Sequence, residues 1–261
     1  MFNKNRFLKF DIFILILFPI LATFISLLIN ANYLVVTLLF FGLPSLYLSI
    51  RTRKRIAKTA LFSLIFSVPL TIIVGYLASI DKAWYIKSTI FDVRLFGLSP
   101  IEDFVWGFLL VYAVVIFYEH FLDKGKNELI NKNMRYLIFV LMIILVLFFI
   151  LVFTNPQILN IPYAYLWLGL FIVILPSIAF LSFFPKMLVK YFKTIPYFVM
   201  LTGLHELTAL ELDLWVFPGA NFIHIFNFLG HLMPLEEFIF FIVLGSAAII
   251  SYFEFFEGDR K

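Results

Sequence analysis

Cysteine is absent from this chain of 261 residues, and charged residues make up only 14% of it. Without thiols the chain has no disulfide, thiolate metal site or cysteine nucleophile. It also lacks the glycine-rich G-x-G-x-x-G motif that binds dinucleotides, and its four histidines are too few for the paired clusters of a membrane di-iron site. We therefore expect no metal site and no dinucleotide bound through such a motif.

Apolar residues are abundant instead, at 63% of the chain against ~45–50% in soluble domains. Eight apolar runs are long enough to cross a ~30 Å hydrocarbon core, and the sequence thus predicts an all-α integral membrane protein with about eight transmembrane helices. The runs are Ile12–Ile29, Tyr33–Ile50, Ala60–Ile80, Ile101–Leu122, Tyr136–Phe153, Ala164–Phe183, Ile195–Leu212 and Pro234–Phe255. The first run follows three basic residues and lacks a clear cleavage site, so we interpret it as a retained signal anchor.

The basic residues predict the orientation of these spans. Most of the 20 Lys and Arg residues lie in segments 4–9, 51–58, 124–135, 186–193 and 260–261, which fall on one side if the eight spans alternate. Only Lys82, Lys87 and Arg94 lie on the other side. This positive-inside distribution predicts a multi-pass protein with both termini in the cytoplasm. The net charge of +4 thus serves orientation, and we expect no nucleic-acid partner.

A short acidic motif occurs twice, each time at the start of an apolar run. The copies are Ser99-Pro100-Ile101-Glu102-Asp103-Phe104 and Met233-Pro234-Leu235-Glu236-Glu237-Phe238. The interval between the copies also separates Tyr118 from Tyr252 and relates the basic loops at 51–58 and 185–193. The sequence therefore predicts two four-helix repeats, residues 1–127 and 128–261. Because four spans per half is an even number, the repeats are expected to be parallel.

Two interpretations of the acid pairs remain open. Ser99, Pro100 and Glu102 have the spacing of a helix capping box, although Met233 cannot cap in this way. Alternatively, two neighbouring carboxyls in an apolar site cannot both ionise cheaply, so one keeps a proton and the other can accept one. This is the pairing needed to add a proton at one carbon and remove it at another. The candidate catalytic residues are Glu236, Glu237, Glu102 and Asp103.

The segments before each motif are aromatic. Trp84 and Tyr85 precede the first copy, and Trp215 and Phe217 precede the second. Such residues are typical of an interfacial belt, but their pairing with the acids favours a site lining, where ring faces could stabilise a carbocation. Glu206 lies within the seventh run, where an acid is a functional candidate. His205 either holds it by a hydrogen bond or forms a packed structural pair with it.

These motifs resemble the membrane lycopene cyclases of the heterodimeric or fused type. Trp215-Val216-Phe217-Pro218 and Pro234-Leu235-Glu236-Glu237-Phe238-Ile239-Phe240-Phe241 are similar to one half of that family. Trp84-Tyr85, Val93-Arg94-Leu95 and Pro100-Ile101-Glu102-Asp103-Phe104 are similar to the other. The half with the Glu-Asp motif comes first here, the reverse of the usual fusions. The acid expected in the span before Trp84 is missing.

The resemblance implies a cofactor-independent isomerisation. An acid protonates the terminal alkene of a linear carotenoid ψ-end group, and the resulting cation closes on a second alkene. A base then removes a proton, which gives a β-ionone ring. It further implies a carotenoid substrate in a prokaryotic cytoplasmic membrane, with a homo-oligomer or other carotenoid enzymes as partners. The substrate-binding residues that it implies are Trp84, Tyr85, Trp215, Phe217, Glu206 and Arg94.

Three other functions are weighed against this one. The chain could cyclise C50 carotenoids or other isoprenoids. An intramembrane glutamate protease with an E-E-x-x-x-R motif is disfavoured, because Phe241 stands where the Arg is required. A small non-enzymatic transporter agrees with parallel repeats and intramembrane acids, but its spans lack broken midplane helices. Proton-coupled uptake that depends on Glu206 would favour the transporter, and carotenoid turnover the cyclase.

Overall fold

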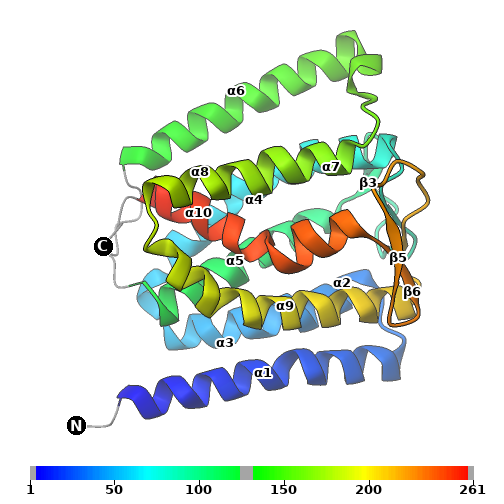
Figure 1. The fold of residues 1–261 in the computed structure, drawn as a ribbon. Coiled ribbons are helices and arrows are strands. Elements are labelled where there is room, and N and C mark those ends of the chain that lie inside the picture. The colour runs from blue at the N-terminus through cyan, green and yellow to red at the C-terminus, as the bar shows by residue number, and fades with distance from the viewer. Residues whose placement is uncertain (1–3, 124–131, 258–261) are drawn as a thin grey trace.

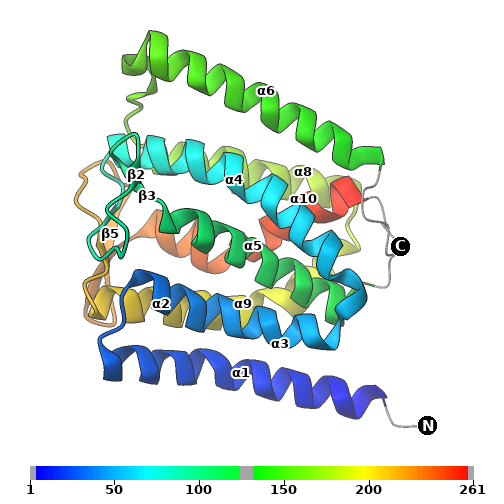
Figure 2. The ribbon, with the colours of Figure 1, turned by 180° about the vertical axis from the view of Figure 1, so that it is seen from behind.

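The computed structural model describes residues 4–123 and 132–257, which are mostly helical. Helical rods run roughly side by side between two ends of the molecule (Figures 1 and 2). The helices are α1 (Lys4–Ile29), α2 (Tyr33–Thr37), η1 (Leu38–Gly42), α3 (Leu43–Arg51), η2 (Arg53–Arg55), α4 (Ile56–Ile80), α5 (Glu102–Phe121), α6 (Lys132–Thr154), η3 (Pro156–Leu159), α7 (Ala164–Leu168), η4 (Gly169–Ile174), α8 (Leu175–Phe183), α9 (Met187–Glu211), η5 (Glu237–Val243) and α10 (Gly245–Glu257). Among the six helical stretches that could cross a membrane, α5 is the most buried, whereas α6 lies at the periphery.

Six helical stretches of the described chain are long and apolar enough to cross a membrane. A seventh is formed if η5 and α10, which meet at a bend of 52°, count as one span. The prediction of a helical membrane protein is confirmed in this coarser form. The helix α9 is not among the six, although it is as long as α4.

Two of the rods are interrupted by a π-helical turn just before a proline. The first rod runs α2, η1 and α3 with Pro44 near the start of α3, and the other runs α7, η4 and α8 with Pro176 at the same place. Proline has no amide hydrogen to donate to the preceding turn. The wider turn accommodates this missing bond within a continuous rod.

Six short strands occupy the end of the molecule opposite to the start of α1 (Figure 1). They form antiparallel pairs of β1 (Tyr85–Ile86) with β4 (Trp215–Val216), β2 (Arg94–Leu95) with β3 (Ser99–Pro100), and β5 (Ile225–Phe228) with β6 (His231–Pro234). The β5–β6 hairpin turns through Leu229 and Gly230, both at positive φ, as a two-residue hairpin loop requires. Sequence analysis predicted only helices and did not anticipate these strands.

The strands overturn the capping-box interpretation of the first motif. Ser99 and Pro100 are paired in β3, α5 begins at Glu102, and the cap position is Ile101, which makes no side-chain cap. Glu102 instead accepts hydrogen bonds from the backbone of the preceding loop. The pairing of β3 with β2 therefore delays the start of the helix.

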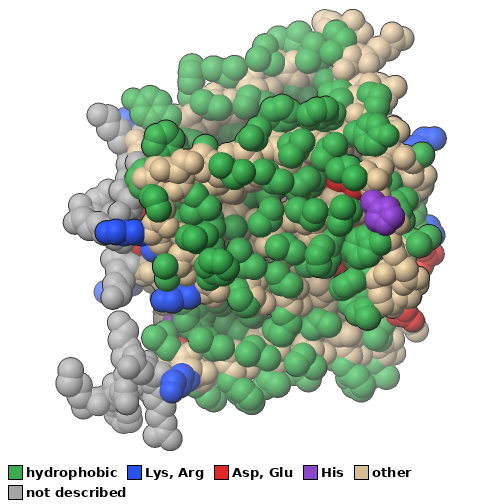
Figure 3. All heavy atoms as spheres, viewed as in Figure 1, with side chains coloured by type: hydrophobic (Ala, Val, Ile, Leu, Met, Phe, Trp, Pro, Cys, Tyr) green, Lys and Arg blue, Asp and Glu red, His purple; other side chains and the backbone are tan. Residues whose placement is uncertain are grey.

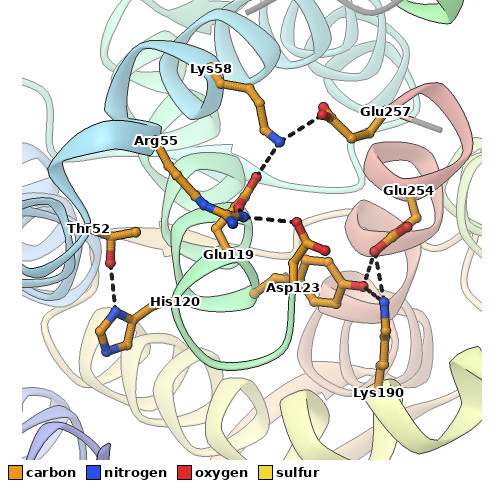
Figure 4. Close-up of polar contacts among 10 residues, drawn as sticks. Thr52, Arg55, Lys58, Glu119, His120, Asp123, Lys190, Glu254 and Glu257 are labelled. Carbon is orange, nitrogen blue, oxygen red and sulfur yellow. Dashed lines mark hydrogen bonds and ion pairs between the residues drawn. The ribbon is translucent and has the colours of Figure 1, made fainter. Parts of the chain in front are cut away.

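At the other end, a buried ionic network joins α4, α5 and α10 (Figure 4). Lys58 on α4 lies between Glu119 of α5 and Glu257 of α10, with Nζ–O distances of 2.7 Å to each. Arg55 contacts Glu119 and lies 3.0 Å from Asp123. A second group places Lys190 of α9 beside Tyr118 and Glu254. These contacts connect segments nearly 200 residues apart.

The surface between the two ends is largely apolar. In Figure 3 hydrophobic side chains cover the rods, and Lys and Arg side chains gather at the end where α1 begins. The predicted boundary between residues 127 and 128 lies outside the described residues, as do the basic residues at 124–131 and 260–261.

Candidate active site

A cavity of about 260 Å³ lies inside the bundle, much larger than the ~30 Å³ that one water molecule occupies in the liquid. Its walls come from α2, α4, β1 and α5 of the first half of the chain and from α7, η4, α9, β4, η5 and α10 of the second. Most lining side chains are aliphatic or aromatic. An apolar molecule is therefore the natural occupant of this space.

Three buried carboxyl groups line the cavity: Asp103, Glu206 and Glu237. The described residues of the lining include no Lys, Arg or His side chain. Each carboxyl accepts one hydrogen bond from an aromatic donor. These donors are Tyr33 for Asp103, with an O–O distance of 3.0 Å, Trp215 for Glu206, with an N–O distance of 2.8 Å, and Tyr165 for Glu237.

The first acid of each motif binds the preceding loop, whereas the second lines the cavity. Glu102 Oε1 accepts hydrogen bonds from the backbone N–H groups of Ile90 and Phe91, at 2.7 and 3.0 Å. Glu236 Oε1 accepts one from Ile223, at 2.6 Å. Neither glutamate is part of the cavity lining. Adjacent residues on a helix point about 100° apart, so only one of each pair can face the cavity while the other holds the preceding loop.

The aromatic residues of the site pack across the two halves of the chain. The Tyr33 ring meets Trp215 edge-on with centroids 5.7 Å apart, and the Tyr165 ring meets Trp84 in the same way at 5.2 Å. Phe217 also lines the cavity. The antiparallel pairing of β1 with β4 places Ile86 opposite Trp215, and Trp84 directly precedes β1. Each acid–tyrosine pair is thus packed against a tryptophan from the opposite half.

Two predicted binding residues lie outside the cavity. Tyr85 is half-exposed, and the Arg94 guanidinium lies 5.0 Å from the centre of its ring. Arg94 donates hydrogen bonds to the carbonyl groups of Ile86 and Leu98, at 2.8 and 2.9 Å. The structure therefore places Tyr85 on β1 and Arg94 on β2, outside the cavity lining, where Arg94 supports the loop.

Sequence analysis missed Tyr33 and Tyr165, which hold the two cavity-facing motif acids. A signal was present: the same interval separates Tyr33 from Pro44 and Tyr165 from Pro176. The proposal that His205 holds Glu206 by a hydrogen bond is wrong. His205 is fully buried among Phe40, Phe41, Trp215 and Phe241, and in the described chain neither of its ring nitrogens has a hydrogen-bond partner. The indole N–H of Trp215 donates the hydrogen bond to Glu206 instead.

Comparison with known proteins adds one finding. Residues 30–121 match the model of the family described as lycopene cyclase. This match supports membership of the lycopene cyclase family. The matched residues contain Tyr33, Trp84, Glu102 and Asp103, whereas Glu206 and Glu237 lie beyond them. No curated protein and no solved structure matches the chain.

The family resemblance inferred from the motifs is thereby confirmed, and membership implies a membrane-bound enzyme, a cyclase. Within the described ranges, no group of three His, Asp or Glu side chains could hold a metal ion. The functional groups that line the cavity are carboxyl groups, hydroxyl groups and aromatic rings.

Proposed function

We propose that this protein cyclises linear carotenoid ψ-end groups, as in lycopene, to β-ionone rings by acid catalysis without a redox step. The observation that carries the proposal is the set of three buried carboxyls, each held by an aromatic donor, in an apolar cavity between two copies of one motif. The family assignment supports the carotenoid as the substrate class.

The chemistry follows from the lining. A neutral carboxylic acid protonates the terminal alkene of the end group, and the resulting tertiary cation closes on the neighbouring alkene. A carboxylate then removes a proton to restore one double bond. Substrate and product are isomers, so no cofactor is required. The rings of Trp84, Trp215 and Phe217 line the cavity and offer negative π-faces to the cation.

The candidate site residues take distinct parts in this proposal. Asp103 and Glu237 exchange protons with the substrate, Glu206 supports them, and Glu102 and Glu236 hold the loops that cover the cavity. Arg94 and Tyr85 fix the strand beside Trp84. The substrate enters from the bilayer, and a homo-oligomer or neighbouring carotenoid enzymes remain our proposed partners.

We also propose that the chain forms two parallel four-helix repeats with eight spans in a prokaryotic cytoplasmic membrane, both termini facing the cytoplasm. Matching features of the two halves support the repeats: the order of helices and strands, the prolines after each π turn, and the two tyrosine–acid bonds. The gathering of basic side chains at one end supports the orientation.

The deciding experiment is expression in a lycopene-accumulating bacterial host, followed by chromatography of the pigments. We expect γ-carotene or β-carotene from the native chain and unchanged lycopene from a D103N/E237Q double variant present at the same level in the membrane. Unchanged lycopene from the native chain would contradict the proposal for this substrate. Parallel hosts that make C50 acyclic carotenoids would show whether the cavity prefers a longer chain.

A further inference from the structure

We propose that the polyene chain of the substrate leaves the cavity along a groove between α8 and α10, in the second half of the protein only. This inference rests on the proposed function and deepens it, because it assigns a binding region for the part of the carotenoid that does not react. Its basis is a second apolar space that shares a wall residue with the cavity, together with a difference between the halves in what covers that place.

The second space is a groove of about 330 Å³ where α8 and α10 pack against each other (Figure 1). Within the described chain its walls come from these two helices alone. The wall on α8 includes Ala179 and Phe183, which are both exposed, and the wall on α10 includes the ring of Phe256. The groove is therefore apolar and opens on the face of the bundle that meets lipid in a membrane.

The groove continues the cavity along the same two rods. Tyr252 is part of both walls, and its hydroxyl donates a hydrogen bond to the carbonyl of Ile172, at 3.0 Å, which connects α10 with η4. Ile172 lines the cavity, and Pro176, about one helical turn later, lines the groove. On α10 the same change occurs between Ile249 and Phe256. A chain that leaves the cavity past Tyr252 thus enters the groove directly.

The length of this path is that of a long chain. Tyr165, which donates its hydrogen bond to Glu237, lies at the start of the rod formed by α7, η4 and α8, and Phe183 ends it. From Tyr165 to Phe183 the rod is about 27 Å long at ~1.5 Å per residue, close to the ~30 Å thickness of a hydrocarbon core. An end group held at Glu237 therefore leaves room for a straight chain laid across the bilayer.

The equivalent place in the first half is filled. Three and seven residues after the proline of each rod, the second half has Ala179 and Phe183, whereas the first half has Tyr47 and Arg51. Both of the latter contact Asp11 of α1: the Tyr47 hydroxyl lies 2.6 Å from Oδ1, and the Arg51 Nε lies 3.0 Å from it. The first helix of the chain is therefore fastened over this rod.

The same carboxylate also reaches α5. Nε2 of His120 lies 2.9 Å from Oδ2 of Asp11, so α1 joins α3 and α5 across the place that corresponds to the groove. The first helix of the second half, α6, instead packs against α4, where Phe148 meets Tyr76 edge-on with ring centroids 5.3 Å apart. Among the described residues, α6 supplies none of the groove walls. The second half alone thus offers a path out of the cavity.

The shape of the groove favours a polyene over a lipid acyl chain. Both are apolar, so the hydrophobic effect gives neither an advantage inside a bilayer, and packing decides. A conjugated chain is flat and straight, and it can stack against rings such as those of Phe180, Phe183 and Tyr252. It also loses little conformational freedom on binding, whereas an acyl chain must first be straightened.

Filling the groove tests the proposal. Because Ala179 is exposed, A179W adds bulk in the groove without displacing the core. We expect the KM for lycopene in vesicles to rise roughly tenfold or more with kcat nearly unchanged, since a region remote from the acids binds substrate and transition state alike. Pseudoionone, a short ketone with the same acyclic end group, should be cyclised as by the native chain. I178W, on an exposed neighbour outside the groove, is the control.

A second pair of variants removes a ring instead of adding one. F183A should raise the KM for lycopene roughly two- to tenfold, the usual range for one lost aromatic contact. F171A is the matched control, because Phe171 is also an exposed ring on the same rod but lines neither space. This comparison uses lycopene alone. Since all four positions are exposed, the Tm of each variant in detergent should stay near that of the native chain.

The outcomes separate this inference from the function on which it rests. No cyclisation of lycopene or pseudoionone by the native chain overturns both. Native cyclisation of lycopene with the same KM in A179W and I178W, and in F183A and F171A, overturns the groove alone and leaves it to bilayer lipid. Equal loss of lycopene and pseudoionone turnover in A179W also overturns it, because the damage would then lie at the acids.

Discussion

The hydroxyl of Tyr33 on α2 donates a hydrogen bond to Oδ1 of Asp103 on α5, with an O–O distance of 3.0 Å. Tyr165 on α7 makes the equivalent bond to Glu237. In both cases the tyrosine comes from the rod that carries a π turn and a proline. Each tyrosine therefore fixes one oxygen of the acid that faces the cavity and leaves the other for the substrate.

Replacing either tyrosine by phenylalanine should lower kcat by about ten- to a hundredfold and leave KM almost unchanged. Phenylalanine keeps the ring contact with Trp215 or Trp84 but removes a hydrogen bond to a carboxyl group, worth ~1.5–3 kcal/mol when the acceptor is charged. Turnover of lycopene in isolated membranes measures this. Y136F, on an exposed position of α6, is the control. Native turnover in both Y33F and Y165F would contradict the positioning role.

Removing a loop-holding glutamate should loosen only its own loop. In E102A, the amides of Ile90 and Phe91 lose their acceptor and should exchange with deuterium faster, because exchange follows local opening. In E236A, the amide of Ile223 should respond instead. Hydrogen-exchange mass spectrometry on the protein in detergent measures both, and each variant serves as the control for the other. Unchanged exchange in both would mean that the loops are held by other contacts.

Lys58→Ala should destabilise the protein strongly. Lys58 is buried between Glu119 and Glu257, and removing one partner of a buried ionic group typically costs about 3–5 kcal/mol because it leaves buried charge uncompensated. The apparent Tm in detergent should fall by several degrees. K54A, on an exposed neighbour in η2, should change it little. A native Tm for K58A would show that Arg55 alone neutralises the cluster.

Gly169→Ala should disturb the cavity wall. A Cβ at this position would lie 1.9 Å from Cδ2 of Phe240, so the ring must move, and overpacking of this kind costs about 1–3 kcal/mol. We expect a lower Tm and slower cyclisation, with partial rescue by F240L in the same chain. The control is G203A, whose Cβ would meet only Ile242 Cγ2, at 3.8 Å. Full stability of G169A without rescue would show that Phe240 can rotate away.

The proposed orientation can be mapped directly, because the chain contains no cysteine and each introduced thiol is the only one. K87C, in the strand-bearing end, should react with a membrane-impermeant maleimide in intact cells. K54C, at the end with the buried ionic network, should react only in inverted vesicles. The reverse pattern would place the termini outside the cytoplasm.

The duplicated acids illustrate how far sequence reasoning reached. The motif, its repetition and the accompanying tryptophans could all be recognised in the sequence. The match of residues 30–121 confirms the resemblance to the lycopene cyclase family. The different roles of the two acids in each motif could not be predicted from the sequence, because Glu102 and Asp103 are both acidic residues at adjacent positions. Only the rotation of α5 and the position of the loop at Ile90 and Phe91 show that Glu102 holds a loop and Asp103 faces the cavity.

Other features depended on contacts between distant segments. The strands β1 and β4 form because two outer loops, 130 residues apart, are brought side by side, and neither segment alone has enough length to indicate a strand. Trp215 was expected as a ring in the wall, yet its N–H also holds Glu206. His205, the sequence neighbour for which such a hydrogen bond was one of two alternatives, packs among aromatic rings instead.

Composition and periodicity by themselves determined that this chain is a helical membrane protein, since apolar runs of that length can be stable only when their backbone groups bond within a helix in the bilayer. The repeated motif likewise determined where the acids lie along the chain. The tertiary structure decided which acids line the cavity and which aromatic donors hold them. These facts depend on side-chain direction and on packing between rods, and neither can be read from residue order alone.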